Sequence, residues 1–281
     1  MVASPKAQLR YRDIKPAIGA EVLAGKAALV DGLYAAEIRE LLEQRGVLVF
    51  PQVHFTDEEH IAFTKTLGRY TPDRPDGEVT LISLDAERNA SADYVKGSFF
   101  WHFDGYMNDV PILASILCAK VLSASGGDTD FCNTYTAYEE LPAERKQQLE
   151  DLSAVHALAG AQLSVEPEPS YETFRKWLAV RRNTLPLVWK HRSGRKSLVI
   201  GNTAVNIPGM DPLEGIELLV WLRDWATQER FRYRHAWLVG DAVMWDNTGT
   251  LHRATPYAFD SGRLMTRTKL AGEEPVVIRA S

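Results

Sequence analysis

Residues 99–107 read Phe-Phe-Trp-His-Phe-Asp-Gly-Tyr-Met, and the informative part is the triplet His102-Phe103-Asp104. In an extended strand, side chains two residues apart point to the same face, so His102 and Asp104 can converge on one ion while Phe103 points away. His252 comes 148 residues after Asp104. Two histidines and one carboxylate leave three metal positions open, a ligand set typical of non-haem Fe(II). The sequence therefore predicts a mononuclear metal site with ligands His102, Asp104 and His252.

Two further segments extend this pattern. Residues 126–129 read Gly-Gly-Asp-Thr, and residues 243–256 read Val-Met-Trp-Asp-Asn-Thr-Gly-Thr-Leu-His-Arg-Ala-Thr-Pro. Arg263 and Arg267 follow His252 by eleven and fifteen residues. The glycines are expected to shape a turn rather than to contact a ligand.

With these motifs in this order, the chain resembles the taurine dioxygenase (TauD/TfdA-like) family of Fe(II)- and 2-oxoglutarate-dependent dioxygenases. The likeness runs from about Ile18 to about Ala271 and includes Gly-Val-Leu-Val-Phe-Pro at 46–51. The resemblance implies a double-stranded β-helix, a jelly-roll barrel of the cupin-like type with helices outside. It also implies Fe(II), 2-oxoglutarate and O2, and an oxidoreductase that hydroxylates its substrate and releases succinate and CO2.

The resemblance also assigns roles to three polar residues. Arg263 would bind the distal carboxylate of 2-oxoglutarate, because a guanidinium offers a carboxylate two parallel charge-assisted hydrogen bonds. Thr129 would donate its hydroxyl to the same carboxylate. Arg267, expected on the same strand face as Arg263, would lie near the keto-acid end or near an acidic group of the substrate, which favours a small organic anion. Asp104 argues against halogenation, because a carboxylate ligand leaves no vacancy for a halide.

The residues around the triplet form a dense apolar cluster, which suits a pocket for an apolar or aromatic substrate body. Tyr106 and Met107 follow Asp104 closely, so they are the predicted substrate contacts together with Arg267. Trp245 is expected to form a wall of the site. The remaining histidines are interpreted as ordinary surface or core residues: His54, His60, His156, His191 and His235.

The composition is that of an ordinary globular protein. Of the 281 residues, 45% are apolar and 25% are charged, which suits one large domain or two small ones. Because the predicted ligands come from distant parts of the chain and must meet, we expect a single domain over residues 1–281. The formal net charge is -5 without a long basic run, which argues against nucleic acid and favours a small-molecule substrate.

Residues 1–12 carry charge without the apolar core of a signal peptide, and no run of about eighteen apolar residues suggests a membrane span. We therefore expect a cytoplasmic protein with no membrane contact. Cys118 and Cys132 lack metal-type spacing and are interpreted as buried free thiols.

Hydrophobic periodicity predicts many short strands with few helices between them. This indicates a mainly β fold with flanking helices, as an antiparallel barrel or sandwich. The predicted helices are 35–44 with Gly46 at its end, 56–67 with a Thr56/Glu59 capping box, 139–152 and 214–227. The predicted strands are 47–50, 79–84, 112–122, 186–190, 197–200, 231–237, 242–246 and 264–270, with a hairpin turn at 191–195.

Two irregular segments and one helix face complete the expectations. Residues 74–98 are expected to act as a lid, and residues 162–184 as an excursion between strands. The face of helix 214–227 that carries Trp221 and Trp225 is expected to lie in the core or in a subunit contact. The relatives suggest a homo-oligomer, either a dimer or a tetramer.

Two other functions would use the same residues. Two histidines and a carboxylate also occur at catalytic zinc, which would make the protein a hydrolase, although Arg263 and Thr129 would then have no purpose. A barrel that holds a metal and a small acid without turnover would be a binding protein. The prime substrate stays open, as does the choice between hydroxylation, desaturation, ring closure and cleavage of a carbon–heteroatom bond.

Overall fold

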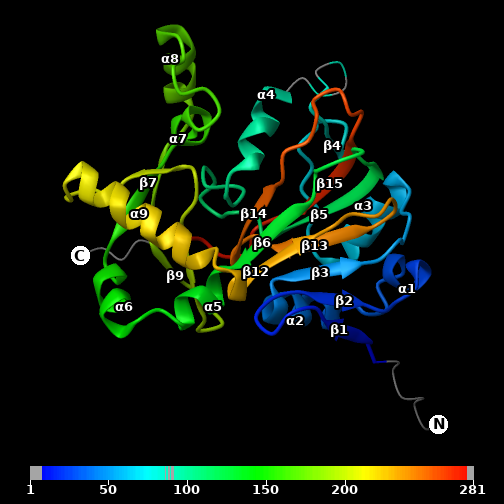
Figure 1. Cartoon of the computed structure of the whole chain (residues 1–281). Coiled ribbons are helices and arrows are strands. Elements are labelled where there is room, and N and C mark those ends of the chain that lie inside the picture. Colours follow the sequence, from blue (N-terminus) through cyan, green and yellow to red (C-terminus); the bar gives the residue numbers. More distant parts are fainter. Residues whose placement is uncertain (1–7, 86, 88, 90–91, 277–281) are drawn as a thin grey trace.

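The computed structural model describes residues 8–85, 87, 89 and 92–276, and two β-sheets form its centre (Figure 1). The larger sheet has seven strands, which is the major layer of a jelly-roll core. Its strands are, in spatial order, β1 (Tyr11–Asp13), β2 (Ala20–Val22), β3 (Val47–Phe50), β13 (Ala242–Asp246), β5 (Ala114–Val121), β15 (Leu264–Leu270) and β4 (Thr80–Ile82). All neighbours are antiparallel except β2 and β3.

The central strands of this sheet are buried on both faces. Val47 and Val49 of β3 pack into the cluster that contains Phe131, whereas Leu48 and Phe50 pack into the cluster beneath the helices. Because side chains alternate along a strand, an uninterrupted apolar run such as β3 supplies both layers.

The smaller sheet faces the first across the cluster that holds Phe131 and Trp245. Its strands are β12 (Arg232–His235), β6 (Thr129–Asn133) and β14 (Thr250–Ala254). Phe131 of β6 is the direct partner of His252 on β14. One predicted ligand is therefore built into the second layer of the core.

Helices on the outer face of the seven-stranded sheet follow the predicted caps. The helices are α1 (Lys26–Val30), α2 (Ala35–Arg45) and α3 (Asp57–Leu67). Gly46 ends α2 with φ at 71°, a conformation that favours glycine. Thr56 and Glu59 form the capping box of α3. Both caps are confirmed.

A second group of elements lies beside the core, on the left in Figure 1. Its strands form two small sheets, namely β7 (Ser153–His156), β8 (Asn183–Pro186) and β11 (Ala204–Asn206), and the hairpin β9 (Val188–Lys190) with β10 (Lys196–Leu198). Its helices are α5 (Thr134–Glu139), α6 (Ala143–Leu149), α7 (Leu158–Leu163), α8 (Tyr171–Ala179), α9 (Pro212–Ala226) and the 3-10 turn η2 (Glu229–Phe231). The predicted turn at 191–195 is confirmed, because β9 and β10 pair antiparallel across it.

The predicted helix 139–152 is confirmed only over α6, and its bounds are wrong. The Asn133 side chain caps α5 and starts a helix earlier, while Pro142 stands at the N-cap of a separate helix, α6. Proline has no backbone N–H and fixes its φ, so it favours a helix start over a helix interior. The predicted strand 186–190 is likewise divided between β8 and β9.

The two irregular segments contain more regular structure than expected. Residues 74–98 include β4, α4 (Ala92–Val95) and the start of η1 (Lys96–Phe99), while residues 86, 88, 90 and 91 lie outside the described residues. Residues 162–184 include α8, which projects away from the core (Figure 1). The lid role and the single-domain division stay predictions.

The aromatic face of α9 packs within its own chain. Trp225 donates from its indole Nε1 to Ala137 O at 2.8 Å and packs against Phe231. Cys118 and Cys132 are buried and free, as predicted. Among the described residues, no helix is long and apolar enough to span a membrane.

Candidate functional site

A single antiparallel bridge joins the two predicted histidine ligands. The His102 N–H donates to His252 O at 3.1 Å, and the His252 N–H donates to His102 O at 2.9 Å. The ring centroids lie 4.1 Å apart. The expectation of a continuous strand through Asp104 is wrong, because the chain bends there and Gly105 has φ at 85°. Only His102 of the triplet is paired.

The structure brings the three predicted ligands together. One ligand atom from each of His102, Asp104 and His252 lies within 4.8 Å of the others. Asp104 Oδ1 lies 3.8 Å from His102 Nε2, and Asp104 Oδ2 lies 3.9 Å from His252 Nε2. Two ligands about 2.1 Å from one ion can lie up to about 4.2 Å apart. Both pairs are therefore close enough to share an ion.

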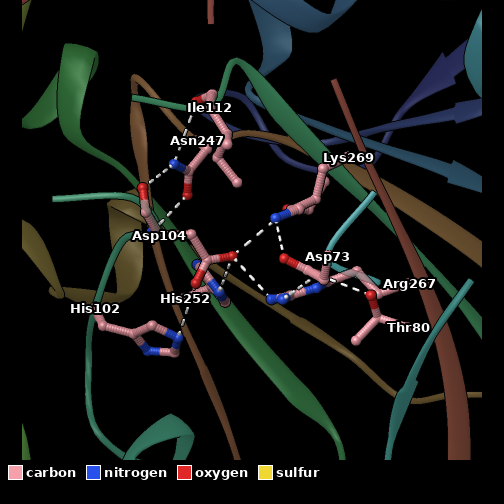
Figure 2. A network of polar contacts seen from close by, with 10 residues as sticks. Asp73, Thr80, His102, Asp104, Ile112, Asn247, His252, Arg267 and Lys269 are labelled. Atoms are coloured by element: carbon pink, nitrogen blue, oxygen red, sulfur yellow. Dashed lines mark hydrogen bonds and ion pairs between the residues drawn. The ribbon is translucent and has the colours of Figure 1, made fainter. Parts of the chain in front are cut away.

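Backbone contacts orient these side chains. Asn247 accepts from the Asp104 N–H at 2.8 Å and donates to Asp104 O at 2.6 Å, which fixes the bend on which the carboxylate stands (Figure 2). His102 Nδ1 lies 2.8 Å from Phe100 O. A donor at Nδ1 leaves the Nε2 lone pair toward Asp104 and the ion. Asn247 was not predicted to have a role; its place in Asp-Asn-Thr-Gly before His252 was the available signal.

The protonation states suit metal binding. Burial favours the protonated form of Asp104, but Arg267, His252 and His102 outweigh burial and lower the pKa of Asp104 to about 2. Burial lowers the pKa of His252 well below its ordinary value, and His102 adds to this effect. A carboxylate and a neutral imidazole are the forms that bind a metal.

Arg263 lies in a buried polar region. It is 4% exposed, donates from a terminal nitrogen to Gly127 O at 3.0 Å, and lies 4.7 Å above the Tyr257 ring. In the described part of the chain it forms no ion pair, and Arg263 Nε, Thr255 Oγ1 and Tyr257 OH have no hydrogen-bond partner. Such groups are rare unless a ligand satisfies them. A dicarboxylic acid such as 2-oxoglutarate fits these donors.

Glycine and threonine complete this region. A Cβ at Gly127 would lie 2.9 Å from Arg263 Nε, so glycine lets the arginine reach the turn. Thr129 starts β6 and accepts from Trp237 Nε1 at 3.0 Å. Its hydroxyl proton is thus left for another acceptor. Burial lowers the pKa of the Arg263 guanidinium, although Tyr257 and Asp128 act against this shift.

Arg267 has different surroundings. It donates to Asp104 Oδ2 at 3.3 Å and to Asp73 Oδ2 at 3.1 Å (Figure 2). The expected shared strand face with Arg263 is wrong, because Arg263 precedes β15 and the register shifts between Leu264 and Met265. Asp73 and its second partner Lys269 were not predicted, since neither belongs to a recognisable motif.

The other predicted contacts are placed less directly. Tyr106 is buried in the core cluster that contains Phe103, and Met107 is 36% exposed. Trp245 packs 4.7 Å from the His252 ring, as expected for a wall residue. The substrate roles of Tyr106 and Met107 stay predictions.

The remaining described histidines have structural surroundings. His60 contacts the Thr268 hydroxyl and His156 the Thr203 hydroxyl, and burial lowers their pKa values to about 3 and about 4. His235 lies between the Tyr233 hydroxyl and Asp241 and thus has two partners where one was expected.

Comparison with known proteins assigns this arrangement to a family. Residues 10–269 match the family described as taurine catabolism dioxygenase TauD, TfdA family. The chain is 32% identical over 280 residues to an (S)-phenoxypropionate/alpha-ketoglutarate-dioxygenase of Sphingobium herbicidovorans, covering 93% of this chain and 95% of that protein. It is 35% identical over 266 residues to an alpha-ketoglutarate-dependent 2,4-dichlorophenoxyacetate dioxygenase of a Burkholderia species, covering 87% and 89%.

A third relative and two solved structures agree. An alpha-ketoglutarate-dependent sulfate ester dioxygenase of Pseudomonas putida is 31% identical, with 96% of this chain and 91% of the relative covered. The structure of AAD-2 in complex with Mn(II) and N-oxalylglycine has a TM-score of 0.83 at 30% identity, covering 96% of this chain and all of the other. A taurine dioxygenase from Burkholderia xenovorans has a TM-score of 0.77 at 30% identity, covering 95% and 92%.

Proposed function

Because the chain belongs to the TauD, TfdA family of 2-oxoglutarate-dependent dioxygenases, we propose that it hydroxylates a small organic acid with an apolar or aromatic body. In this proposal, His102, Asp104 and His252 hold Fe(II), while Arg263 and Thr129 hold the distal carboxylate of 2-oxoglutarate. The convergence of the three ligand atoms within 4.8 Å carries the proposal. Cytoplasmic location and a dimeric or tetrameric assembly stay predictions.

The protein's own residues position and protect the reactants. When bound, Fe(II), 2-oxoglutarate and O2 would supply the oxidising chemistry, with one oxygen atom going to the substrate and one to succinate, and with CO2 released. Asn247 holds the backbone of Asp104, and Phe100 O orients the His102 ring. Trp245 and Phe131 pack against the His252 ring and keep that side dry. A site that excludes water limits side reactions of the oxidant.

Aryloxy acids and sulfate esters are the first substrates to test, because relatives that cover nearly the whole chain are named for them. Hydroxylation of the carbon next to an ether oxygen gives a hemiacetal, which collapses to a phenol and an aldehyde. Phenoxyacetate would thus yield phenol and glyoxylate. Two cations, Arg267 and Lys269, lie near Asp104. Their positive charge favours the binding of an acidic substrate.

Replacing a ligand tests the proposal most directly. His102→Ala and Asp104→Ala should lower phenoxyacetate-dependent succinate release at least about 1000-fold, because the open metal site loses one of three protein ligands. Bound iron should fall in parallel and can be measured by atomic emission. His54→Asn, a change at an exposed histidine with φ at 48°, is the matched control and should retain both iron and activity.

Two further measurements distinguish the proposed dioxygenase from a zinc hydrolase and from a non-catalytic binding protein. Anaerobic Fe(II) with 2-oxoglutarate should give a weak visible charge-transfer band in the wild type and not in His102→Ala. Turnover with zinc and without O2 would instead indicate a hydrolase. Tight binding of acids with no succinate from any aryloxy acid or sulfate ester would indicate a binding protein.

A further inference from the structure

The carboxylate of Asp73 is held by three donors beside the metal ligands. Thr80 Oγ1 donates to Asp73 Oδ2 at 2.8 Å, a terminal nitrogen of Arg267 donates to the same oxygen at 3.1 Å, and Lys269 Nζ donates to Oδ1 (Figure 2). Arg267 and Lys269 lower the pKa of Asp73 although burial opposes this shift. Asp73 is therefore a charged group in a cationic environment.

The three donors belong to neighbouring strands. Arg267 of β15 is the direct register partner of Thr80 on β4, and Lys269 lies two residues further along β15 on the same face. The result is a hydroxyl, a guanidinium and an ammonium that converge from a hydrogen-bonded sheet. This donor set suits a carboxylate or another oxyanion.

The anion that fills this set comes from outside the sheet. Asp73 lies between Tyr70, which makes an isolated bridge, and β4, in a stretch of turns and bends. Its side chain keeps 30% of its exposure, so water reaches one side of the contact. A short irregular segment can move without breaking the pairing of β4 with β15.

The donor set is connected to the metal centre through one side chain. The second terminal nitrogen of Arg267 donates to Asp104 Oδ2 at 3.3 Å, and Lys269 also helps to lower the pKa of Asp104. Arg267 Nε is buried and has no hydrogen-bond partner among the described residues. An anion bound at this set would therefore lie beside Asp104, one of the proposed metal ligands.

We propose that Asp73 occupies the position of the substrate's acidic group and competes with it for Thr80, Arg267 and Lys269. This inference rests on the proposed function and specifies its substrate site. A carboxylate substrate enters by displacing the Asp73 carboxylate and thereby releases residues 72–79 from Arg267 and Lys269, while the backbone hydrogen bond from the Thr71 N–H to Lys269 O holds the start of the segment. Because one monoanion replaces another, the gain in charge pairing is small, and Asp73 weakens acid binding relative to neutral analogues.

Removal of the Asp73 charge tests the competition. In the anaerobic Fe(II) and 2-oxoglutarate complex, Asp73→Asn should bind phenoxyacetate about 10-fold more tightly than the wild type, since the charge-assisted contacts of Asp73 with Arg267 and Lys269 no longer have to be broken. Binding of neutral phenoxyacetamide should change less than about 2-fold. Asp73→Ala should act in the same direction if Asp73→Asn is unstable.

A matched control is available in the same segment. Asp76 is also acidic, but it pairs with Arg74 and contacts neither cation of β15. Asp76→Asn should leave both dissociation constants unchanged. An equal gain for Asp76→Asn would show a general charge effect and would overturn the proposal.

Hydrogen–deuterium exchange gives a second readout that needs no turnover. Phenoxyacetate should increase amide exchange in residues 72–79 of the wild type, because Asp73 loses its contacts with Arg267 and Lys269, and should have little effect in Asp73→Asn. Unchanged or slower exchange in the wild type would overturn displacement. If 2-phenoxyethylamine bound the wild type more tightly than phenoxyacetate, and Asp73→Asn abolished that preference, Asp73 would bind the amino group of a basic substrate. That result would overturn the proposal. Loss of succinate release alone would contradict the proposed function and leave these binding results standing.

Discussion

Arg263 and Arg267 are four residues apart, yet their surroundings are opposite. Arg263 is buried against Tyr257 with a backbone carbonyl as its acceptor, and burial lowers its pKa. Arg267 contacts two carboxylates, Asp73 and Asp104, which raise its pKa although burial opposes them. The difference indicates which anion each arginine serves. Arg263 has no ion-pair partner among the described residues and is available for an acid from solution. Arg267 is already paired with carboxylates of its own chain.

The comparison also separates stability from function. A buried cation without a counter-charge costs free energy in the free protein, so its presence points to a ligand. Removal of a buried cation that lies between two carboxylates leaves their charges unpaired whether or not a ligand is bound. The following variants test whether the two arginines differ in this way.

The largest effect is expected on 2-oxoglutarate binding. Arg263→Ala should raise the 2-oxoglutarate concentration for half-maximal succinate release about 100-fold, because two charge-assisted hydrogen bonds are lost. Arg263→Lys should restore only part of this affinity, since an ammonium is not a planar fork. Arg223→Ala, at an exposed arginine of α9, is the control. If Arg263→Ala kept the wild-type 2-oxoglutarate requirement, Arg263 would not be the residue that binds the co-substrate.

A smaller difference is expected in the stability of the metal-free protein. Arg267→Met should lower the free energy of unfolding by about 2 kcal/mol, because two partly buried carboxylates lose their shared counter-charge. Arg263→Met should change it by less than about 1 kcal/mol, because no ion pair is broken. Urea titrations measure both. Equal losses of unfolding free energy in the two variants would show that the ion pairs of Arg267 do not make it more important for stability than Arg263.

The smallest effect concerns the hydroxyl near Arg263. Thr129→Val should raise the 2-oxoglutarate requirement about 10-fold, which corresponds to one hydrogen bond of about 1.4 kcal/mol. Thr129→Ser keeps the hydroxyl and should stay close to the wild type. If valine and serine behaved alike, the hydroxyl would serve only Trp237, whose indole N–H it accepts.

Much of the site could be predicted because its residues stand in motifs. His102 and Asp104 lie two apart, and His252 follows in a recognisable motif, so the sequence pointed to three residues that the structure brings together. Local signals were equally effective for caps, such as Gly46 and the Thr56/Glu59 pair. Because each of these features depends on a short stretch of chain, it can be predicted from the local sequence.

Other parts depend on contacts between distant residues and could not be predicted. Asp73 meets Arg267 across 194 positions, in a segment without periodicity, and nothing local marks that pairing. Asn247 acts on Asp104 through the backbone, so its residue type gave only a weak indication. Pro142 in the sequence indicated a break in the predicted helix 139–152. The start of α5 at Thr134 depends on the side-chain cap from Asn133, which was not predicted.

The reciprocal hydrogen bonds between His102 and His252 have a consequence for metal capture. Because these hydrogen bonds hold the backbones of the two histidines together, a metal ion bound by both imidazoles would spend little binding energy on ordering the chain. Repeated loss and reloading of iron would then leave the fold intact.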